Sequence, residues 1–140
     1  MAILARAVMC VALLLCAPHL AHAQDLIAHP STGVDSLSRN EARLFFTMRV
    51  KQWPNGTPVK VFVLPDNHAL HGRFVSGRLE LYPYQLRRVW DRQLFSGTGQ
   101  APVTVTSERE MMERVATNPG AIGYATGPFD PSSVRILEVR

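Results

Sequence analysis

Cysteine is nearly absent from this chain of 140 residues, and both of its cysteines, Cys10 and Cys16, lie close to the N-terminus. The rest of the chain can therefore form neither a disulfide framework nor a zinc site with cysteine ligands. Catalytic signatures are also absent, because the sequence contains no Gly-x-Ser-x-Gly elbow and no His-Glu-x-x-His helix. The length suffices for one domain, which excludes a multidomain enzyme. We expect a protein that is not an enzyme and that has no catalytic residue and no cofactor.

The chain also lacks any concentration of charge of one sign. Charged residues make up 19% of the sequence and the net charge is +4, with basic and acidic residues interspersed. The basic residues do not alternate with aromatic side chains in a stripe, which disfavours a nucleic-acid-binding surface. Hydrophobic residues make up 46% of the sequence, a fraction too high for a disordered tail. The composition indicates a folded domain with a mixed surface and no nucleic-acid partner.

Residues 1–23 have the features of a secretory signal peptide. Arg6 supplies a positive charge, a short apolar stretch runs from Val8 to Ala17, and Ala21-His22-Ala23 forms an A-x-A cleavage site. The apolar stretch is shorter than the roughly 20 residues that span a bilayer, so a retained membrane anchor is the less favoured alternative. We therefore expect cleavage after Ala23, a periplasmic location, and a mature domain of residues 24–140 with no transmembrane segment.

The first part of the mature chain contains two predicted strands and a predicted helix between them. Residues 25–29 and 59–64 are short apolar runs, which are typical of buried strands. Ser38 and Glu41 have the spacing of a capping box, in which each side chain accepts a hydrogen bond from the other residue's backbone N–H. The sequence therefore predicts a helix that begins after Ser38.

Two more helices are expected in the middle of the chain. One should follow the second strand, with Asp66 or Asn67 as its cap, and end near Gly77. The next should begin at Pro83, because proline is favoured in the first helical turn. Its apolar residues recur every three or four positions, at Leu86, Val89, Trp90 and Leu94. We expect this stripe to face a core that contains the large side chains of Trp53, Phe62, Trp90 and Phe95.

The last third of the chain continues the alternation of strands and helices. It contains a predicted strand at residues 103–105, a helix capped by Ser107, and two more strands at residues 122–125 and 134–139. Strands that alternate with helices are typical of an α/β domain. The sequence therefore predicts a three-layer α/β/α fold with a mixed sheet of about five strands and four helices.

Residues 118–124, with the sequence Asn-Pro-Gly-Ala-Ile-Gly-Tyr, join the last predicted helix to a strand. Asn118 can end the helix in a left-handed conformation, and the proline after it prevents continuation. Gly120 can open the turn, and Gly123 allows a close approach of other groups to the strand. We interpret this segment mainly as a folding device and not as a ligand contact.

This segment and an earlier one resemble signatures of a known family. Residues 37–46, followed by Trp53-Pro54-Asn55-Gly56, and residues 118–124 resemble the phosphate-binding group of periplasmic solute-binding proteins. Proteins of that group serve phosphate ABC transporters. The resemblance implies a type 2 periplasmic-binding-protein fold, in which two α/β lobes enclose an anion. Because the chain is too short for two lobes, it implies a single-lobe member.

The segment after the second strand departs from the pattern of that family. Phosphate binders carry an arginine and then Ser-Gly-Thr where a helix begins, which places amides, hydroxyls and a guanidinium around an oxyanion. Residues 64–74 have no arginine at that clamp position and no Ser-Gly-Thr, and Asp66 would repel an anion. For a small anion, the resemblance points to this loop, with Asn67 and His68 as hydrogen-bond donors and Arg73 as a more distant charge.

Two other groups of side chains leave alternatives open. One candidate metal-binding group consists of Asp66, His68 and His71. Its ligand set is incomplete, so solvated histidines and no metal are the favoured interpretation. A basic helix face consists of Arg87, Arg88 and Arg92. That face is either a solvated surface or a docking site for an acidic partner.

Two functions follow as hypotheses. The first is an exported, non-enzymatic module similar to a solute-binding protein, which binds a small anion such as phosphate in connection with phosphate transport. The second is a protein-interaction module that has lost solute binding and contacts a periplasmic or membrane-associated protein partner. The first is the leading hypothesis, and the absent second lobe and the absent oxyanion-binding residues are the support for the second.

Overall fold

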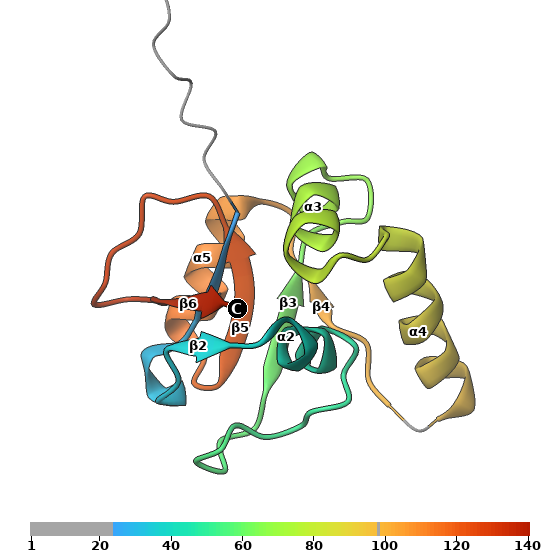
Figure 1. Cartoon of the computed structure of the whole chain (residues 1–140), viewed down its shortest axis with the longest axis horizontal. Helices are drawn as coiled ribbons and strands as arrows, with labels where there is room; N and C mark the ends of the chain where they lie inside the picture. The colour runs from blue at the N-terminus through green and yellow to red at the C-terminus, as the bar shows by residue number, and fades with distance from the viewer. Residues whose placement is uncertain (1–23, 98) are drawn as a thin grey trace, which may run out of the picture.

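The computed structural model describes residues 24–97 and 99–140, so the expected signal peptide lies outside the described residues. A six-stranded sheet forms the centre of the domain, with the strand order β2-β6-β1-β5-β3-β4 (Figure 1). The strands are β1 (Asp25–Ala28), β2 (Ser36–Leu37), β3 (Lys60–Val63), β4 (Val103–Thr104), β5 (Ala121–Ala125) and β6 (Arg135–Val139).

The sheet is mixed, as predicted. β1 runs antiparallel to both of its neighbours, β5 and β6, whereas β3 runs parallel to β5 and to β4. The described sheet has six strands where about five were expected, and the strand that the sequence did not indicate is β2. β2 has only two residues, with Ser36 opposite Glu138 of β6 in a parallel pair. Two residues are too few for a recognisable pattern, so only its pairing with β6 defines this strand.

Four α-helices connect and cover the strands, in agreement with the sequence prediction (Figure 1). They are α2 (Arg39–Phe46), α3 (Ala69–Phe74), α4 (Pro83–Ser96) and α5 (Glu108–Thr117). α3 continues directly into a turn of π-helix, Val75–Leu79. Among residues 24–97 and 99–140, no helix combines the length and the apolar character needed to cross a membrane.

Capping interactions determine where α2 and α3 begin. The Ser38 hydroxyl accepts a hydrogen bond from the Glu41 N–H at 3.1 Å, and the Glu41 carboxylate accepts one from the Ser38 N–H at 2.7 Å, which confirms the predicted capping box. At α3 the cap is His68, whose Nδ1 accepts a hydrogen bond from the backbone two residues further on. The prediction of Asp66 or Asn67 as this cap is wrong, because both residues lie in the turn that precedes the helix.

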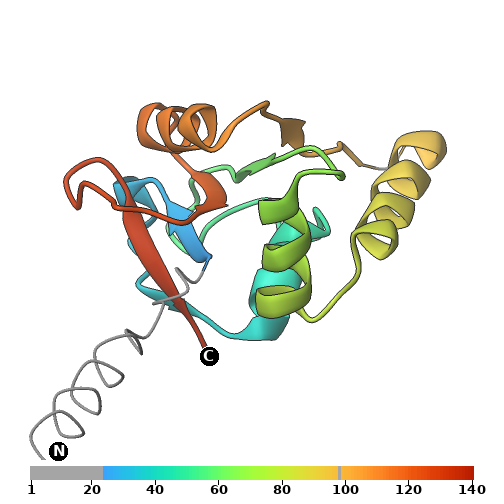
Figure 2. The ribbon, with the colours of Figure 1, turned by 90° about the horizontal axis from the view of Figure 1, so that it is seen from above.

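The helices lie on both faces of the sheet, which confirms the three-layer α/β/α fold. Figure 2 shows α5 above the sheet and α2 and α3 below it. Neighbouring residues of β5 face these two layers, as expected from the alternation of side chains along a strand. A Cβ atom on Gly123 would lie 2.5 Å from the sulfur of Met111 on α5. The next residue, Tyr124, packs instead against the rings of Phe46 and Phe74 from α2 and α3.

The segment between α5 and β5 packs tightly against the chain before β3. Gly120 has a φ of 80°, and a Cβ atom there would lie 2.0 Å from the backbone oxygen of Pro58. The carbonyl of Gly120 also accepts a hydrogen bond from the buried indole of Trp53 at 2.9 Å. The left-handed residue is therefore Gly120, whereas Asn118 is extended and the prediction for it is wrong. These contacts support the interpretation of this segment as a folding device.

The core contains three of the four large aromatic residues assigned to it from the sequence. Trp53, Phe62 and Trp90 are at most 3% exposed, and the Trp90 indole donates a hydrogen bond to the Phe46 carbonyl at 2.8 Å. The prediction for Phe95 is wrong, because its side chain is 91% exposed. Phe95 follows Leu86 by nine residues, which places it on the side of α4 that faces away from the buried Leu86 and Trp90.

Candidate functional site

The predicted anion-binding residues lie where β3 leads into α3. Asn67 is exposed in the turn after the strand, and His68 is half-buried with its Nδ1 committed to capping α3 at 3.1 Å. Arg73 is exposed on α3, five residues further along the chain. The fold therefore brings Asn67 and His68 together in one turn, while Arg73 extends from the helix that follows.

The charge at this turn comes from an ion pair that the sequence did not indicate. The Asp66 carboxylate accepts two hydrogen bonds from the Arg87 guanidinium on α4, at 2.8 Å and 3.0 Å. These hydrogen bonds hold the pKa of Asp66 below its usual value and raise the pKa of Arg87. The guanidinium also lies over the ring of Trp90, 5.1 Å from its centre. Arg87 is therefore engaged in an ion pair with the domain's own Asp66, while its side chain stays 41% exposed on α4.

A buried histidine lies behind this ion pair. His71 is fully buried on α3, and its Nδ1 is hydrogen-bonded to the hydroxyl of Tyr124 on β5. The Tyr124 oxygen accepts a hydrogen bond from the Leu64 N–H at 2.8 Å, so the hydroxyl proton is directed to His71. The remaining ring nitrogen, Nε2, is directed towards Asp66 at 3.9 Å and has no hydrogen-bond partner among the described residues.

Burial determines the protonation of this pair. Desolvation lowers the pKa of His71, and the guanidinium of Arg87 lowers it further against the opposing effect of the Asp66 carboxylate. Desolvation also raises the pKa of Tyr124 well above its usual value. Both rings are therefore neutral at neutral pH, and the tyrosine is not an available nucleophile. The cluster joins the β3–α3 turn to the core, and its outer end is the Asp66–Arg87 ion pair.

The three candidate metal ligands do not act as one group. His68 caps α3, His71 binds Tyr124, and Asp66 binds Arg87. Within the described ranges, no three side chains of the metal-binding types gather around one point. The arrangement supplies an internal salt bridge and not a set of open ligands.

Sequence reasoning missed Arg87 and Tyr124 as parts of this site. Arg87 is 21 residues from Asp66, and its position on α4 resembles that of any solvated basic residue. Tyr124 belongs to the segment interpreted as a folding device, and only the tertiary structure shows its hydroxyl against His71. One signal was available, because a histidine on the apolar side of a predicted helix needs a hydrogen-bonding partner in the core.

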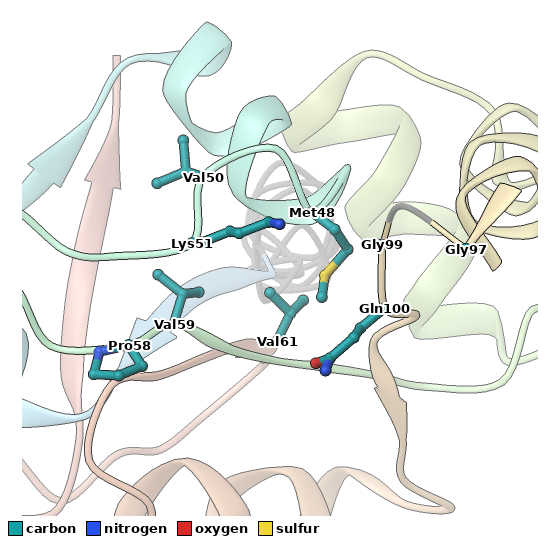
Figure 3. Close-up of a pocket in the computed structure, with 9 residues that line it drawn as sticks. All are labelled: Met48, Val50, Lys51, Pro58, Val59, Val61, Gly97, Gly99 and Gln100. Atoms are coloured by element: carbon teal, nitrogen blue, oxygen red, sulfur yellow. The ribbon is translucent and has the colours of Figure 1, made fainter.

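A second candidate site lies at the other end of β3. A pocket of about 430 Å³ opens there, between the end of α2, the strand and the loop after α4 (Figure 3). Its floor includes Val59 and Val61, and its polar groups include the side chains of Lys51 and Gln100. We call it the Lys51 pocket. It is separate from the β3–α3 turn, because it lies at the N-terminal end of β3 whereas Asp66 follows the C-terminal end.

Several solved structures match the fold of this chain, among them proteins of phosphate ABC transport. PstS from Borrelia burgdorferi matches with a TM-score of 0.63 and 13% identity, over 84% of this chain and 47% of that chain. A putative phosphate ABC transporter substrate-binding protein with bound phosphate, from Clostridium perfringens, matches with a TM-score of 0.60 and 18% identity, over 84% and 44%. An ABC-type phosphate transport receptor from Vibrio cholerae matches with a TM-score of 0.55 and 15% identity, over 84% and 46%.

These matches establish the class of fold. The chain has the α/β fold of phosphate ABC transporter substrate-binding proteins, as the resemblance in its sequence implied. It spans less than half the length of each of these solved chains, as expected for a short, single-lobe form. No protein-family model matches the chain, and no curated protein matches it either.

Proposed function

We propose that this protein is an exported, non-enzymatic binding module with the fold of a phosphate-binding protein, and that it contacts an acidic protein partner in the periplasm. The observation that carries the proposal is the Asp66–Arg87 ion pair at the β3–α3 turn. A receptor for an oxyanion needs donors that are not already neutralised. Here a carboxylate of the chain itself occupies the guanidinium, and its negative charge repels a second anion.

A surface suited to a protein partner lies on the outward side of α4. Tyr84, Arg88, Arg92 and Phe95 recur at intervals of four, four and three residues, so they lie on one side of the helix, which we call the α4 outer face. Tyr84 and Phe95 are 56% and 91% exposed, and the guanidinium of Arg88 lies over the Tyr84 ring at 5.6 Å.

The chemistry of the α4 outer face favours an acidic protein. Tyrosine, phenylalanine and arginine are enriched in the central parts of protein interfaces. The one acidic residue of α4, Asp91, lies 3.9 Å from Arg87, so Arg88 and Arg92 keep their charges available for a partner. A stacked tyrosine, Tyr82, extends this surface at the start of the helix, 5.7 Å from Tyr84. Carboxylates of a partner can therefore pair with the arginines while its apolar groups cover the aromatic rings.

Site-specific photocrosslinking tests this proposal. A benzophenone amino acid in place of Phe95, in cells that carry the protein, should give one discrete adduct in the envelope fraction. The adduct should disappear when Arg88→Glu and Arg92→Glu are added, because both arginines then repel the acidic partner. The matched control is the same crosslinker in place of Arg109, whose side chain is 90% exposed on α5. Equal adducts at both positions, or an adduct that survives both arginine changes, would contradict the proposal.

The second candidate function is binding of a small anion at the β3–α3 turn. It is supported by the exposed Asn67, by the ring of His68 and by the charge of Arg73, and by the fold shared with a protein described with bound phosphate. Calorimetric titration with phosphate, sulfate and carboxylates separates the two functions. Saturable heat with phosphate that decreases in Arg73→Gln would favour the anion receptor, whereas no saturable heat with phosphate or sulfate would favour the interaction module.

A further inference from the structure

We propose that the Lys51 pocket binds a carboxylate that carries a short apolar group. The chemistry of its lining points to this class of ligand. Val59 and Val61 form an apolar floor, and none of the described residues that line the pocket is acidic. Lys51 forms no ion pair among residues 24–97 and 99–140. In Figure 3 its side chain extends across the pocket towards Met48, and Gln100 approaches from the other side. The described lining residues thus place one cation and one side-chain amide around an apolar floor, an arrangement that suits an amphipathic anion.

One wall of the pocket is held in place by a tight turn. The chain reverses between Lys51 and Val59, whose N–H donates a hydrogen bond to the Lys51 carbonyl at 3.0 Å. Inside this turn the Trp53 N–H donates to the Thr57 carbonyl at 2.9 Å, and the Trp53 side chain is buried in the core. The backbone of Lys51 is therefore fixed next to the apolar floor, which limits where its side chain can reach.

The opposite wall is fixed by α4. Met48 has a φ of 62°, an uncommon conformation for a residue with a side chain, and it directs the chain away from α2. The amide of Gln93 on α4 donates a hydrogen bond to the Thr47 carbonyl beside Met48, at 2.8 Å. Gly99 packs against the same Gln93, because a Cβ atom on Gly99 would lie 3.0 Å from the Gln93 Cβ. Gln93 thus connects both ends of this wall.

The volume limits the size of the ligand. A pocket of about 430 Å³ is at the small end of the range for ligand sites, which is roughly 300–1,000 Å³. It can accommodate a carboxylate with a chain of a few carbons, or the last residue of a peptide with its terminal carboxylate. Both sources present the same chemistry, an anion for Lys51 and an apolar group for Val59 and Val61. This inference does not depend on the α4 outer face or on the β3–α3 turn.

Titration of the ¹⁵N-labelled protein, followed by NMR, tests the inference. The probes are hexanoate, its neutral counterpart hexanol, and an N-acetylated tripeptide ending in valine as the free acid and as the C-terminal amide. We expect hexanoate or the peptide acid to shift the amide signals of Gly97, Gly99 and Gln100 to saturation. Binding of hexanoate alone identifies a free acid as the source, and binding of the peptide acid alone identifies a chain terminus. Hexanol and the peptide amide should bind at least about tenfold more weakly.

The two lysines of the chain provide a matched pair of variants. Lys51→Met should weaken binding by about tenfold, because it removes the cation and keeps the length of the side chain. Lys60→Met removes the same charge from the strand position between Val59 and Val61, whose side chain does not line the pocket, and should leave binding unchanged. Both lysines are exposed, so neither change should unfold the protein. Equal effects of the two variants, shifts centred on His68, or no saturable shift with either acid would overturn the inference.

Discussion

The carboxylate of Asp66 and the guanidinium of Arg87 face each other in a two-point contact, with nitrogen–oxygen distances of 2.8 Å and 3.0 Å. This contact joins the turn after β3 to α4, across 21 residues of sequence. It also places a negative charge at the turn where the sequence resemblance implied a site for a small anion. Two partly exposed charges of this kind contribute at most about 1 kcal/mol to stability. The importance of the pair therefore lies in its charge and not in the folding energy that it supplies.

His71 makes the stability of the protein depend on pH. Burial lowers the folded-state pKa of His71 below its ordinary value of 6.5, so the unfolded chain binds more protons as the pH falls through that value. The free energy of unfolding should therefore decrease between about pH 7 and pH 5, by at most about 1.4 kcal/mol per pH unit. Urea unfolding at several pH values in this window measures the slope.

The control for this pH dependence is His71→Gln, which removes the titrating group and keeps a hydrogen-bonding side chain near Tyr124. The variant should show a smaller slope between about pH 7 and pH 5. Asp66 and Glu41 have lowered pKa values, so their protonation also reduces the free energy of unfolding. That loss occurs only below their ordinary pKa values of 3.8 and 4.5, which lie outside the window of about pH 7 to pH 5. An unchanged slope in His71→Gln would show that another group is responsible.

Gly120→Ala should be strongly destabilising. The added Cβ would lie 2.0 Å from the Pro58 backbone oxygen, and the φ of 80° is unfavourable for any residue with a side chain. We expect a loss of about 3 kcal/mol or more in the free energy of unfolding. Gly72→Ala is the matched control, because nothing lies within 4 Å of a Cβ there and the residue is inside α3. This second variant should be stabilising, by about 0.5–1 kcal/mol. Similar losses in both variants would be inconsistent with the packing described at Gly120.

Phe95 and Trp90 lie on the same helix and should respond in opposite ways to truncation. Phe95→Ser should change the free energy of unfolding by less than about 0.5 kcal/mol, since the side chain is 91% exposed. Trp90→Ala should cost about 3–5 kcal/mol, because it opens a cavity and removes the hydrogen bond to the Phe46 carbonyl. Chemical denaturation of both variants measures the difference. A large loss in Phe95→Ser would mean that the α4 outer face is part of the core.

The sequence was informative for several features that depend on neighbouring residues. The capping box of Ser38 and Glu41 is a contact over three positions, so its spacing alone located the start of α2. The turn at Gly120 was also recognisable, because proline and glycine restrict the backbone in known ways. The alternation of such local signals along the chain is what made the α/β class and the number of helices predictable.

Features that depend on distant residues could not be predicted in this way. The Asp66–Arg87 pair and the Tyr124–His71 hydrogen bond link segments that are 21 and 53 residues apart. Leu94 illustrates a different limit, since its position fits the apolar periodicity of α4 although its side chain is 51% exposed. Periodicity predicts which side of a helix is apolar, and only the tertiary structure determines how far along the helix that side is covered.

Calorimetric titration with phosphate, of the wild-type protein and of Asp66→Ser, tests the central claim most directly. The claim is that the carboxylate of Asp66 pairs with the Arg87 guanidinium beside the β3–α3 turn and so keeps it from binding an anion. The wild type should give no saturable heat. Asp66→Ser should bind phosphate at least about tenfold more tightly than the wild type, because Arg87 is then free and the like charge is gone. Tight binding of phosphate by the wild type, or weaker binding by Asp66→Ser, would contradict the account.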